Sequence, residues 1–148
     1  MSSRTSYRVL AINPGSTSTK IGLYEDETCV YTKDIKHGVA ELSGFDLVID
    51  QLDYRESVVR QTLAEAGIEI DSLDAIAARG GRLRPIPSGV YAVNNAMLHD
   101  AQVGFQGDHA SNLACIIGWR LVAGTDIPVY VVDPVSVDEM WPMAKVSG

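Results

Sequence analysis

The residues best suited to chemistry lie between Asn13 and Lys20, directly after a short apolar run. Pro14 lacks a backbone donor and Gly15 tolerates positive φ, so the chain can turn tightly there and leave amides unpaired. Hydroxyl and cationic side chains follow: Ser16, Thr17, Ser18, Thr19 and Lys20. Amides, hydroxyls and a lysine charge all attract phosphate oxygens. The segment therefore predicts a phosphate-binding hairpin.

A Walker loop and an ordinary turn are the two alternatives for this segment. Gly15 lies five residues before Lys20, and Walker loops also place a lysine near glycine, but Thr19 stands where that motif needs glycine. Ile21 stands where the motif needs Ser or Thr, and the residues that follow alternate like a strand. The Walker motif is thereby excluded. An ordinary hairpin turn stays open, because these residue types are common in turns generally.

The elements that must position this hairpin follow from the apolar pattern. Apolar runs predict five strands, over residues 9–12, 21–24, 28–35, 73–77 and 127–132. Apolar residues at helical spacing predict two long helices, over residues 45–66 and 111–122, the first capped by Gly67. Residues 90–93 are a candidate short strand, and Asn94 or Asn95 can cap a short helix after it. Three strands followed by alternating helices and strands predict an α/β fold, a mixed five-stranded sheet with helices on both faces.

Three polar residues lie where the predicted strands end. Asn13 follows the first strand, Arg79 the fourth and Asp133 the fifth. Ligands of open α/β sheets bind at the carboxyl ends of strands, so these three residues predict a single site. Arg79, Arg82 and Arg84 also form a short basic cluster, which indicates a local anion site.

Composition limits the class of protein. The 148 residues are 46% hydrophobic and 21% charged, which suits one globular domain with an adequate core. A formal net charge of -7 argues against binding to nucleic acid. No apolar stretch approaches the roughly 20 residues that span a membrane, and the polar start does not resemble a signal peptide, so a cytoplasmic location is expected. Cys29 and Cys115 have no metal-type spacing and are expected to be reduced and buried.

Four segments together resemble one known family. They are VLAINPGSTSTKIGLY (9–24), ARGGRLRPIPSGVYAVNNAML (78–98), GDHASNLACIIGW (107–119) and YVVDPVSVDEM (130–140). They resemble the butyrate kinases, in the acetate kinase group of the superfamily that also holds sugar kinases, heat-shock proteins and actin. The resemblance implies a ribonuclease H-like, actin-like ATPase domain. It also implies reversible phosphoryl transfer between ATP and a short-chain fatty acid such as butyrate, giving ADP and an acyl phosphate, with Mg²⁺.

The resemblance also implies site residues. It assigns nucleotide phosphates and magnesium-bound water to Asn13 and to the turn residues Gly15, Ser16, Thr17, Ser18 and Thr19. Lys20 adds charge, or is a solvated strand residue. Arg79, with Gly80 and Gly81 beside it, is implied to bind the substrate carboxylate or the transferring phosphoryl group, since a guanidinium binds either in a bidentate manner.

Two further roles are implied near the reacting phosphoryl group. His109 is expected to donate to the developing charge, and its alternative is a residue that caps the next helix. Asp133 is expected to hold Mg²⁺ through water together with Asn13, and its alternative is a plain turn residue. Phosphoryl transfer depends mainly on positioning and charge neutralisation, which are the tasks these residues would perform.

The resemblance covers residues 1–148 as an N-terminal acyl kinase domain. The C-terminal nucleotide-binding domain of a complete enzyme is absent from this chain, so the chain alone is expected to be inactive and to bind ATP weakly. The whole enzyme is expected to be a homo-oligomer. Acetate, propionate and branched acids stay open beside butyrate. A non-catalytic module that binds phosphate or acyl phosphate is the alternative function; sugar phosphorylation is disfavoured because no sugar-binding segment with an Asp base is found.

Overall fold

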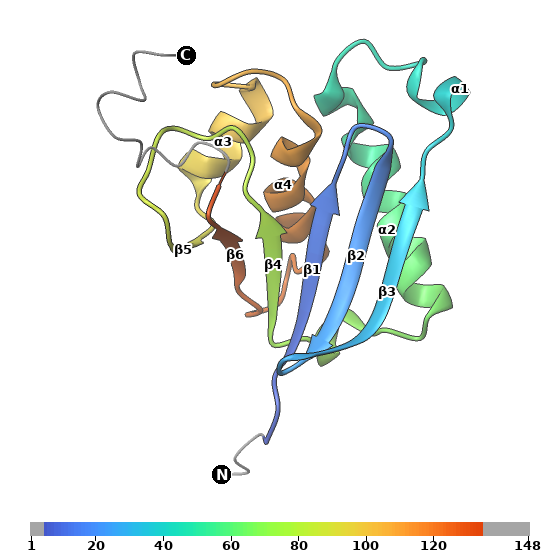
Figure 1. The fold of residues 1–148 in the computed structure, drawn as a ribbon, viewed down its shortest axis with the longest axis vertical. Coiled ribbons are helices and arrows are strands. Elements are labelled where there is room, and N and C mark those ends of the chain that lie inside the picture. Colours follow the sequence, from blue (N-terminus) through green and yellow to red (C-terminus); the bar gives the residue numbers. More distant parts are fainter. Residues whose placement is uncertain (1–4, 135–148) are drawn as a thin grey trace.

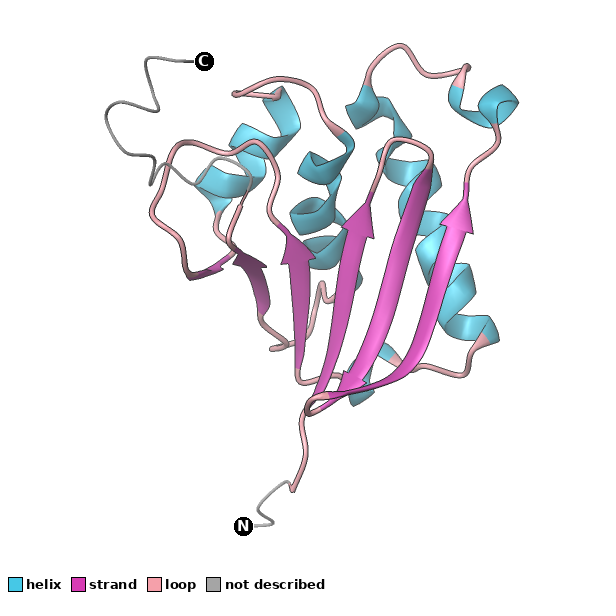
Figure 2. Cartoon of the chain, viewed as in Figure 1, coloured by secondary structure: helices cyan, strands magenta, loops and turns pink. Residues whose placement is uncertain are grey.

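A computed structural model describes residues 5–134 as one six-stranded sheet with helices packed against it (Figure 1, Figure 2). The strands are β1 (Arg8–Pro14), β2 (Ser18–Glu25), β3 (Thr28–Lys36), β4 (Ala75–Arg79), β5 (Val90–Ala92) and β6 (Val129–Val132). Their order across the sheet is β3-β2-β1-β4-β6-β5. The strands β1, β4 and β6 are parallel neighbours, so their carboxyl ends meet at one edge.

Within residues 5–134, four α-helices and three 3₁₀ turns connect the strands. The helices are α1 (Val39–Leu42), α2 (Leu52–Glu65), α3 (Asn95–Val103) and α4 (Leu113–Leu121). The 3₁₀ turns are η1 (Val48–Gln51), η2 (Ile70–Ser72) and η3 (Ala110–Asn112). The long helix predicted from residue 45 therefore begins later as α2, after η1. Asn94 caps α3 by accepting a hydrogen bond from the Met97 amide, as one of the two predicted caps.

Alternation along the strands decides where the core lies. Every second residue of the central strands is buried, and the intervening residues are more exposed except Gly22 of β2. The buried set is Leu10, Ile12, Ile21, Leu23, Ile76, Ala78, Val129 and Val131. The helices α2 and α4 pack on this buried side. Seven of the nine residues of α4 are buried, which agrees with its apolar sequence. The alternating pattern indicates a sheet with one covered face.

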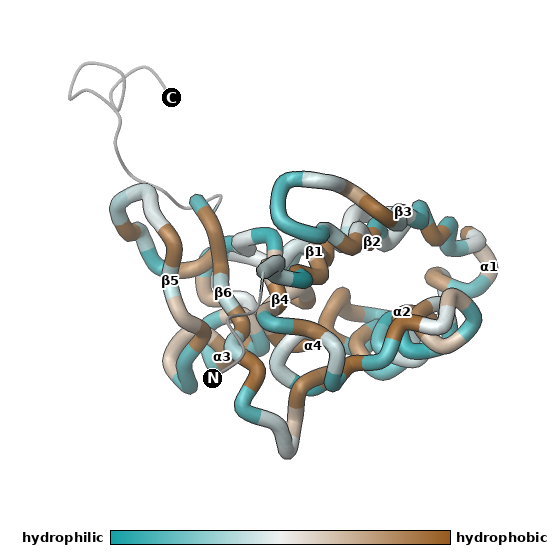
Figure 3. Tube along the Cα trace, turned by 90° about the horizontal axis from the view of Figure 1, so that it is seen from below, coloured by the Kyte–Doolittle hydropathy of each residue, from teal (hydrophilic) through white to brown (hydrophobic). Residues whose placement is uncertain are grey.

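Two predictions about the sheet are corrected by the structure. The sheet has six strands rather than five, because Val90–Ala92 pairs in an antiparallel manner with β6. Within residues 5–134, α2 and α4 lie on the same face of the sheet rather than on opposite faces (Figure 3). The crossover from β3 to β4 and the crossover from β4 to β6 step in the same direction along the sheet. Two right-handed crossovers that step the same way place their helices on the same face.

None of the helices between residues 5 and 134 has the length and apolar character needed to cross a lipid bilayer.

Candidate functional site

The predicted phosphate hairpin is the tight turn of residues 15–18, which runs from the end of β1 to the first residue of β2. The amide of Gly15 donates to the carbonyl oxygen of Ser18 at 2.7 Å, which closes the turn. Gly15 is not among the residues with positive φ, so the turn does not use a left-handed glycine as the sequence analysis expected. Ser16 and Thr17 are exposed at the tip.

Arg55 of α2 lies directly behind this tip and is fully buried. Its Nη1 donates to the carbonyl oxygens of Gly15 at 2.8 Å and Ser18 at 3.1 Å. Its Nη2 donates to the carbonyl oxygen of Ser16 at 3.2 Å. The Arg55 guanidinium therefore donates hydrogen bonds to three of the four carbonyl oxygens of the turn.

The fourth carbonyl group is held by the backbone. The amide of His37 donates to the carbonyl oxygen of Thr17 at 2.9 Å. All four carbonyl oxygens of the turn thus have donors inside the protein. By contrast, the amides of Ser16 and Thr17 donate to no acceptor within residues 5–134. The unpaired amides that the sequence analysis placed at this turn belong to these two residues.

Thr19 lies behind the hairpin rather than at its tip. Its side chain is fully buried, and its Oγ1 accepts a hydrogen bond from Arg55 Nη1 at 3.2 Å. The same oxygen lies 2.8 Å from Nε2 of His37. The hydroxyl is therefore used inside the protein, and Thr19 supports the turn instead of offering a donor at its surface.

A chain of hydrogen bonds continues from Thr19 to α1. The Tyr54 hydroxyl donates to Glu41 Oε2 at 2.9 Å, and its oxygen lies 3.1 Å from His37 Nδ1. Because the Tyr54 proton is used on Glu41, His37 Nδ1 carries the proton in this pair. Nε2 of a neutral His37 then accepts from Thr19. Burial and the nearby Arg55 charge lower the pKa of His37, which keeps the ring neutral.

Arg55 and His37 were not among the site residues predicted from the sequence. A signal for Arg55 was present, because it lies between Leu52 and Val59 at spacings of three and four on the buried stripe of α2. An arginine on such a stripe needs acceptors inside the fold, since its charge is costly to bury. His37 carries no comparable signal.

Asn13 and Arg79 meet at the edge where the parallel strands end. Arg79 Nη1 donates to Asn13 Oδ1 at 3.0 Å, although the two residues are far apart in the chain. Both side chains are exposed at this edge. On the other side of Asn13, Lys20 is its partner across β1 and β2. Asn13 and Lys20 line a surface pocket of about 210 Å³ on the face of the sheet opposite the helices.

Gly80 and Gly81 pack against other parts of the protein. A Cβ added at Gly80 would lie 2.1 Å from Cα of Pro134, and one added at Gly81 would lie 2.7 Å from Cα of Asn112. The Asn112 side chain, which is 2% exposed, accepts from the Arg82 amide at 2.8 Å and donates to the Gly107 carbonyl at 3.0 Å. The two glycines therefore allow the segment after β4 to pass close to its neighbours, and thereby place Arg79.

Asp133 directly follows β6, next to the end of β4. Its Oδ1 accepts from the Gly89 amide at 2.7 Å, and its own amide donates to the Gly89 carbonyl at 3.0 Å. Its φ of 39° places it in the left-handed region that turn residues use. Among residues 5–134, no hydrogen bond or ion pair joins Asp133 to Asn13 or Arg79. Asp133 is a turn residue at the predicted edge, with its carboxylate at the molecular surface.

His109 caps the turn η3 in the structure. Its Nδ1 accepts from the Ser111 amide at 3.1 Å and lies 2.7 Å from Ser111 Oγ. The capping role that was left open is thus observed. Because Nδ1 accepts, the neutral ring carries its proton on Nε2, which leaves a donor on the other side of the ring.

Few side chains at the carboxyl ends of the parallel strands could serve as ligands for a magnesium ion. Within the described part of the chain, no three His, Cys, Asp or Glu side chains are close enough to hold a metal together. Mg²⁺ is commonly held by one or two carboxylates together with substrate phosphates, so a single Asp133 carboxylate fits its needs. Asn13 Oδ1 already accepts from the Arg79 cation, which favours contact through water over direct ligation.

Sequence comparison shows a strong similarity to a butyrate kinase. Butyrate kinase 1 of Clostridium acetobutylicum is 49% identical over 142 residues, which cover 96% of this chain and 40% of the relative. The chain therefore spans two fifths of the length of the curated relative that it matches. No family model matches the chain.

Solved structures agree on the fold. An acetate kinase of Porphyromonas gingivalis matches with a TM-score of 0.59 at 13% identity, covering 93% of this chain and 40% of that one. An acetate kinase of Entamoeba histolytica matches with a TM-score of 0.56 at 15% identity, covering 84% and 34%. A propionate kinase of Francisella tularensis matches with a TM-score of 0.51 at 13% identity, covering 85% and 36%. The chain is thus a homologue of butyrate kinase over two fifths of that enzyme's length, with the fold of the acetate kinases.

Proposed function

We propose that residues 1–148 form the N-terminal, acyl-binding domain of a butyrate kinase. The whole enzyme would transfer a phosphoryl group between ATP and a short-chain fatty acid, giving ADP and an acyl phosphate. The observation that carries the proposal is the Arg79–Asn13 pair at the carboxyl ends of β1 and β4. This is the edge at which open α/β sheets bind ligands, and it lies at the same end of β1 as the phosphate hairpin.

Arg79 would bind the carboxylate of the fatty acid and the acyl phosphate formed from it. Its bond to Asn13 fixes one edge of the guanidinium, and the exposed side chain keeps further donors for a bidentate contact. The positive charge would also reduce repulsion between the carboxylate and the incoming phosphoryl group.

The hairpin would hold the phosphate chain of the nucleotide. The free amides of Ser16 and Thr17 are its main donors, with the Ser16 and Thr17 hydroxyls as additional ones. The Ser18 hydroxyl bonds to the Asp34 carboxylate. Lys20 is exposed and opposes Asp34 across the sheet, so we assign it a secondary charge role. We leave the Thr19 hydroxyl, Gly80 and Gly81 out of the contact set, since each is used inside the protein.

His109 and Asp133 would complete the site. The Nε2–H of His109 would donate to the phosphoryl oxygens as charge develops on them. Asp133 and Asn13 would hold Mg²⁺ through its bound water. That ion, when bound, neutralises charge on the phosphate oxygens.

The remaining parts of the reaction belong to the rest of such an enzyme. We place the adenosine pocket in a C-terminal domain and expect the whole enzyme to be a homo-oligomer that binds neither nucleic acid nor membranes. We place it in the cytoplasm because it consumes ATP, an intracellular nucleotide. By itself, the 148-residue chain should show negligible turnover and weak binding of ATP.

A chimeric enzyme tests the proposal. This chain would replace the matching 40% of the Clostridium acetobutylicum relative, and acyl phosphate formation from ATP and butyrate, acetate or propionate would be measured. We expect activity with butyrate that the substitution Arg79→Gln removes. A folded chimera that binds butyryl phosphate but forms none would instead favour the alternative, a non-catalytic acyl-phosphate-binding module.

A further inference from the structure

We propose that Arg55 is the positioning residue of the phosphate hairpin: it holds the carbonyl groups of the turn inward, so that the amides of Ser16 and Thr17 face a phosphate ligand, and its charge strengthens that attraction. This inference rests on the proposed function, because it concerns how the same hairpin binds phosphate.

The direction of the peptide groups in the turn decides whether it can bind a phosphate. A phosphate at this tip needs amide donors and is repelled by carbonyl oxygens. Arg55 donates to the carbonyl oxygens of Gly15, Ser16 and Ser18 from the two Nη atoms of one rigid plane. Since a peptide group is planar, turning its carbonyl oxygen inward turns the amide of the next residue outward. Arg55 on Gly15 therefore orients the Ser16 amide, and Arg55 on Ser16 orients the Thr17 amide.

The positive charge of Arg55 also favours a phosphate at the tip of the turn. Arg55 is 0% exposed, and its partners in the structure are neutral oxygens: the three carbonyls, Thr19 Oγ1 and Gln51 Oε1. Burial lowers the pKa of Arg55, and none of the partners just named carries a negative charge that would compensate the guanidinium. A phosphate at the tip would supply the missing negative charge across a short path of low dielectric.

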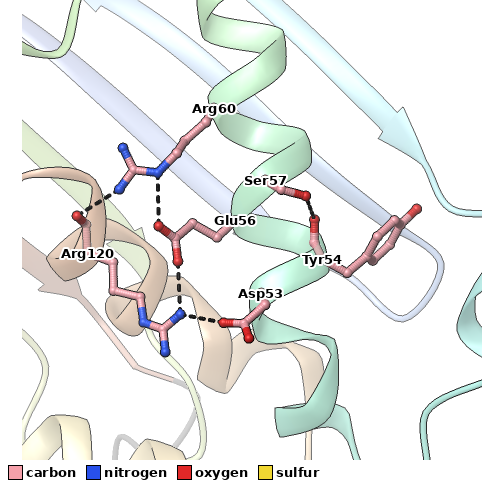
Figure 4. Close-up of polar contacts among 6 residues, drawn as sticks. All are labelled: Asp53, Tyr54, Glu56, Ser57, Arg60 and Arg120. Carbon is pink, nitrogen blue, oxygen red and sulfur yellow. Dashed lines mark hydrogen bonds and ion pairs between the residues drawn. The ribbon is translucent and has the colours of Figure 1, made fainter.

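Two other arginines, at the contact between α2 and α4, differ from Arg55 because they are paired with carboxylates. Arg60 donates to Glu56 Oε1 at 2.9 Å, and Arg120 donates to Asp53 at 2.7 Å and to Glu56 at 3.0 Å (Figure 4). These pairs lie at the contact between α2 and α4 and are partly exposed. Arg60 is therefore a matched control, an arginine on the same helix whose charge is already paired with a carboxylate.

The test is a titration of the 148-residue chain with inorganic pyrophosphate, followed by amide NMR. In the unmodified chain, we expect the Ser16 and Thr17 amides to shift most. Arg55→Lys keeps the charge but loses the planar fork, and we expect about tenfold weaker binding of pyrophosphate. Arg55→Gln loses both and should bind more weakly still, whereas Arg60→Gln should bind like the unmodified chain. Binding of butyrate, followed at the Arg79 Nε–H signal, should be unchanged in every variant that folds.

The possible failures are distinguishable. Pyrophosphate shifts at Ser16 and Thr17 with equal affinity in both Arg55 variants would overturn the role of Arg55 and leave the proposed function standing. If the Ser16 and Thr17 amides do not shift in the unmodified chain, the hairpin does not bind phosphate and the inference is overturned. An inactive chimera would instead count against the kinase function. If neither variant folds, the Arg55 Nε–H signal of the unmodified chain decides: a shift that follows pyrophosphate supports the role, and no shift overturns it.

Discussion

The Nη1 atom of Arg79 and the Oδ1 atom of Asn13 are 3.0 Å apart, joined by a hydrogen bond between the ends of two parallel strands. The bond orients a cation at an exposed edge of the sheet, where few other contacts restrict it. Since Asn13 Oδ1 already accepts this hydrogen bond, Asn13 acts on a ligand mainly by orienting the Arg79 guanidinium.

Replacing Arg79 should reduce ligand binding without reducing stability. Arg79→Lys removes the planar pair of donors, and we expect butyryl phosphate to bind about tenfold more weakly to the 148-residue chain. The free energy of unfolding should change by less than about 0.5 kcal/mol, because the side chain is exposed. Calorimetric titration and urea unfolding measure the two quantities. Arg60→Lys is the matched control; an equal loss of binding in that variant would contradict a specific role for Arg79.

Two glycines at the site should lose stability to very different extents when replaced by alanine. Gly80→Ala places a Cβ 2.1 Å from Cα of Pro134, so backbone must move, and we expect a loss of about 1–3 kcal/mol in the free energy of unfolding. Gly15→Ala meets only Ser18 atoms at 3.6 Å or beyond, and its φ is not positive, so the loss should be under about 0.5 kcal/mol. Urea unfolding of both variants tests this, and equal stabilities would contradict the close packing of Gly80.

His37 should make stability depend on pH. Burial and the Arg55 charge lower its pKa in the folded protein, against the opposite effects of Glu41 and Asp34. The unfolded chain therefore binds a proton first as pH falls through about 6.5, and the folded state loses stability below that pH. Glu41 and Asp34 also have lowered pKa values, so their contributions disappear only in more acidic solution.

The measurement is the free energy of unfolding at pH values of about 7.5 and 5.5. We expect a decrease in the unmodified chain and a smaller decrease in His37→Gln. His99→Gln, at a different histidine, should retain the full decrease. If the decrease survives unchanged in His37→Gln, the assignment to His37 is wrong.

The two cysteines should differ sharply in reactivity. Cys115 of α4 is buried, which raises the pKa of its thiol to about 11. Cys29 is exposed on β3, contrary to the expectation that both are buried. A thiol reagent should therefore modify Cys29 in the folded chain and Cys115 only after denaturant is added. Mass spectrometry of digested protein distinguishes the sites, and early modification of Cys115 would show that α4 is less protected than the structure indicates.

The Arg120 network should contribute modestly to the packing of α4 against α2. Arg120→Met removes the pairs with Asp53 and Glu56, and we expect a loss of about 0.5–1 kcal/mol in the free energy of unfolding that shrinks in high salt. Lys36→Met removes a more exposed pair with Asp34 and should cost less. Urea unfolding at low and high salt compares them; a loss at Arg120 that does not respond to salt would assign the effect to apolar packing.

Much of the fold was predictable because strands and helices leave periodic patterns. The apolar alternation located the main strands, and the polar residues after them placed Asn13 and Arg79 at one edge, where the structure joins them. The 3₁₀ start before α2 was missed because a helical pattern does not distinguish the two kinds of turn. Val90–Ala92 was left as a candidate because three residues carry too little pattern to decide on a strand.

Local features follow from the order of the residues alone: the turn at residues 15–18, the elements around it and the combination of motifs that resembles the butyrate kinases. Which groups of that turn face outward depends instead on contacts with distant residues. The outward direction depends on Arg55 and His37, which lie farther along the chain and donate hydrogen bonds to carbonyl oxygens of the turn. These oxygens belong to the backbone, so the residue types of the turn do not reveal their partners. Nearly every residue has the same backbone N–H and C=O groups, so the direction in which these groups point is set by the partners that tertiary packing brings near them.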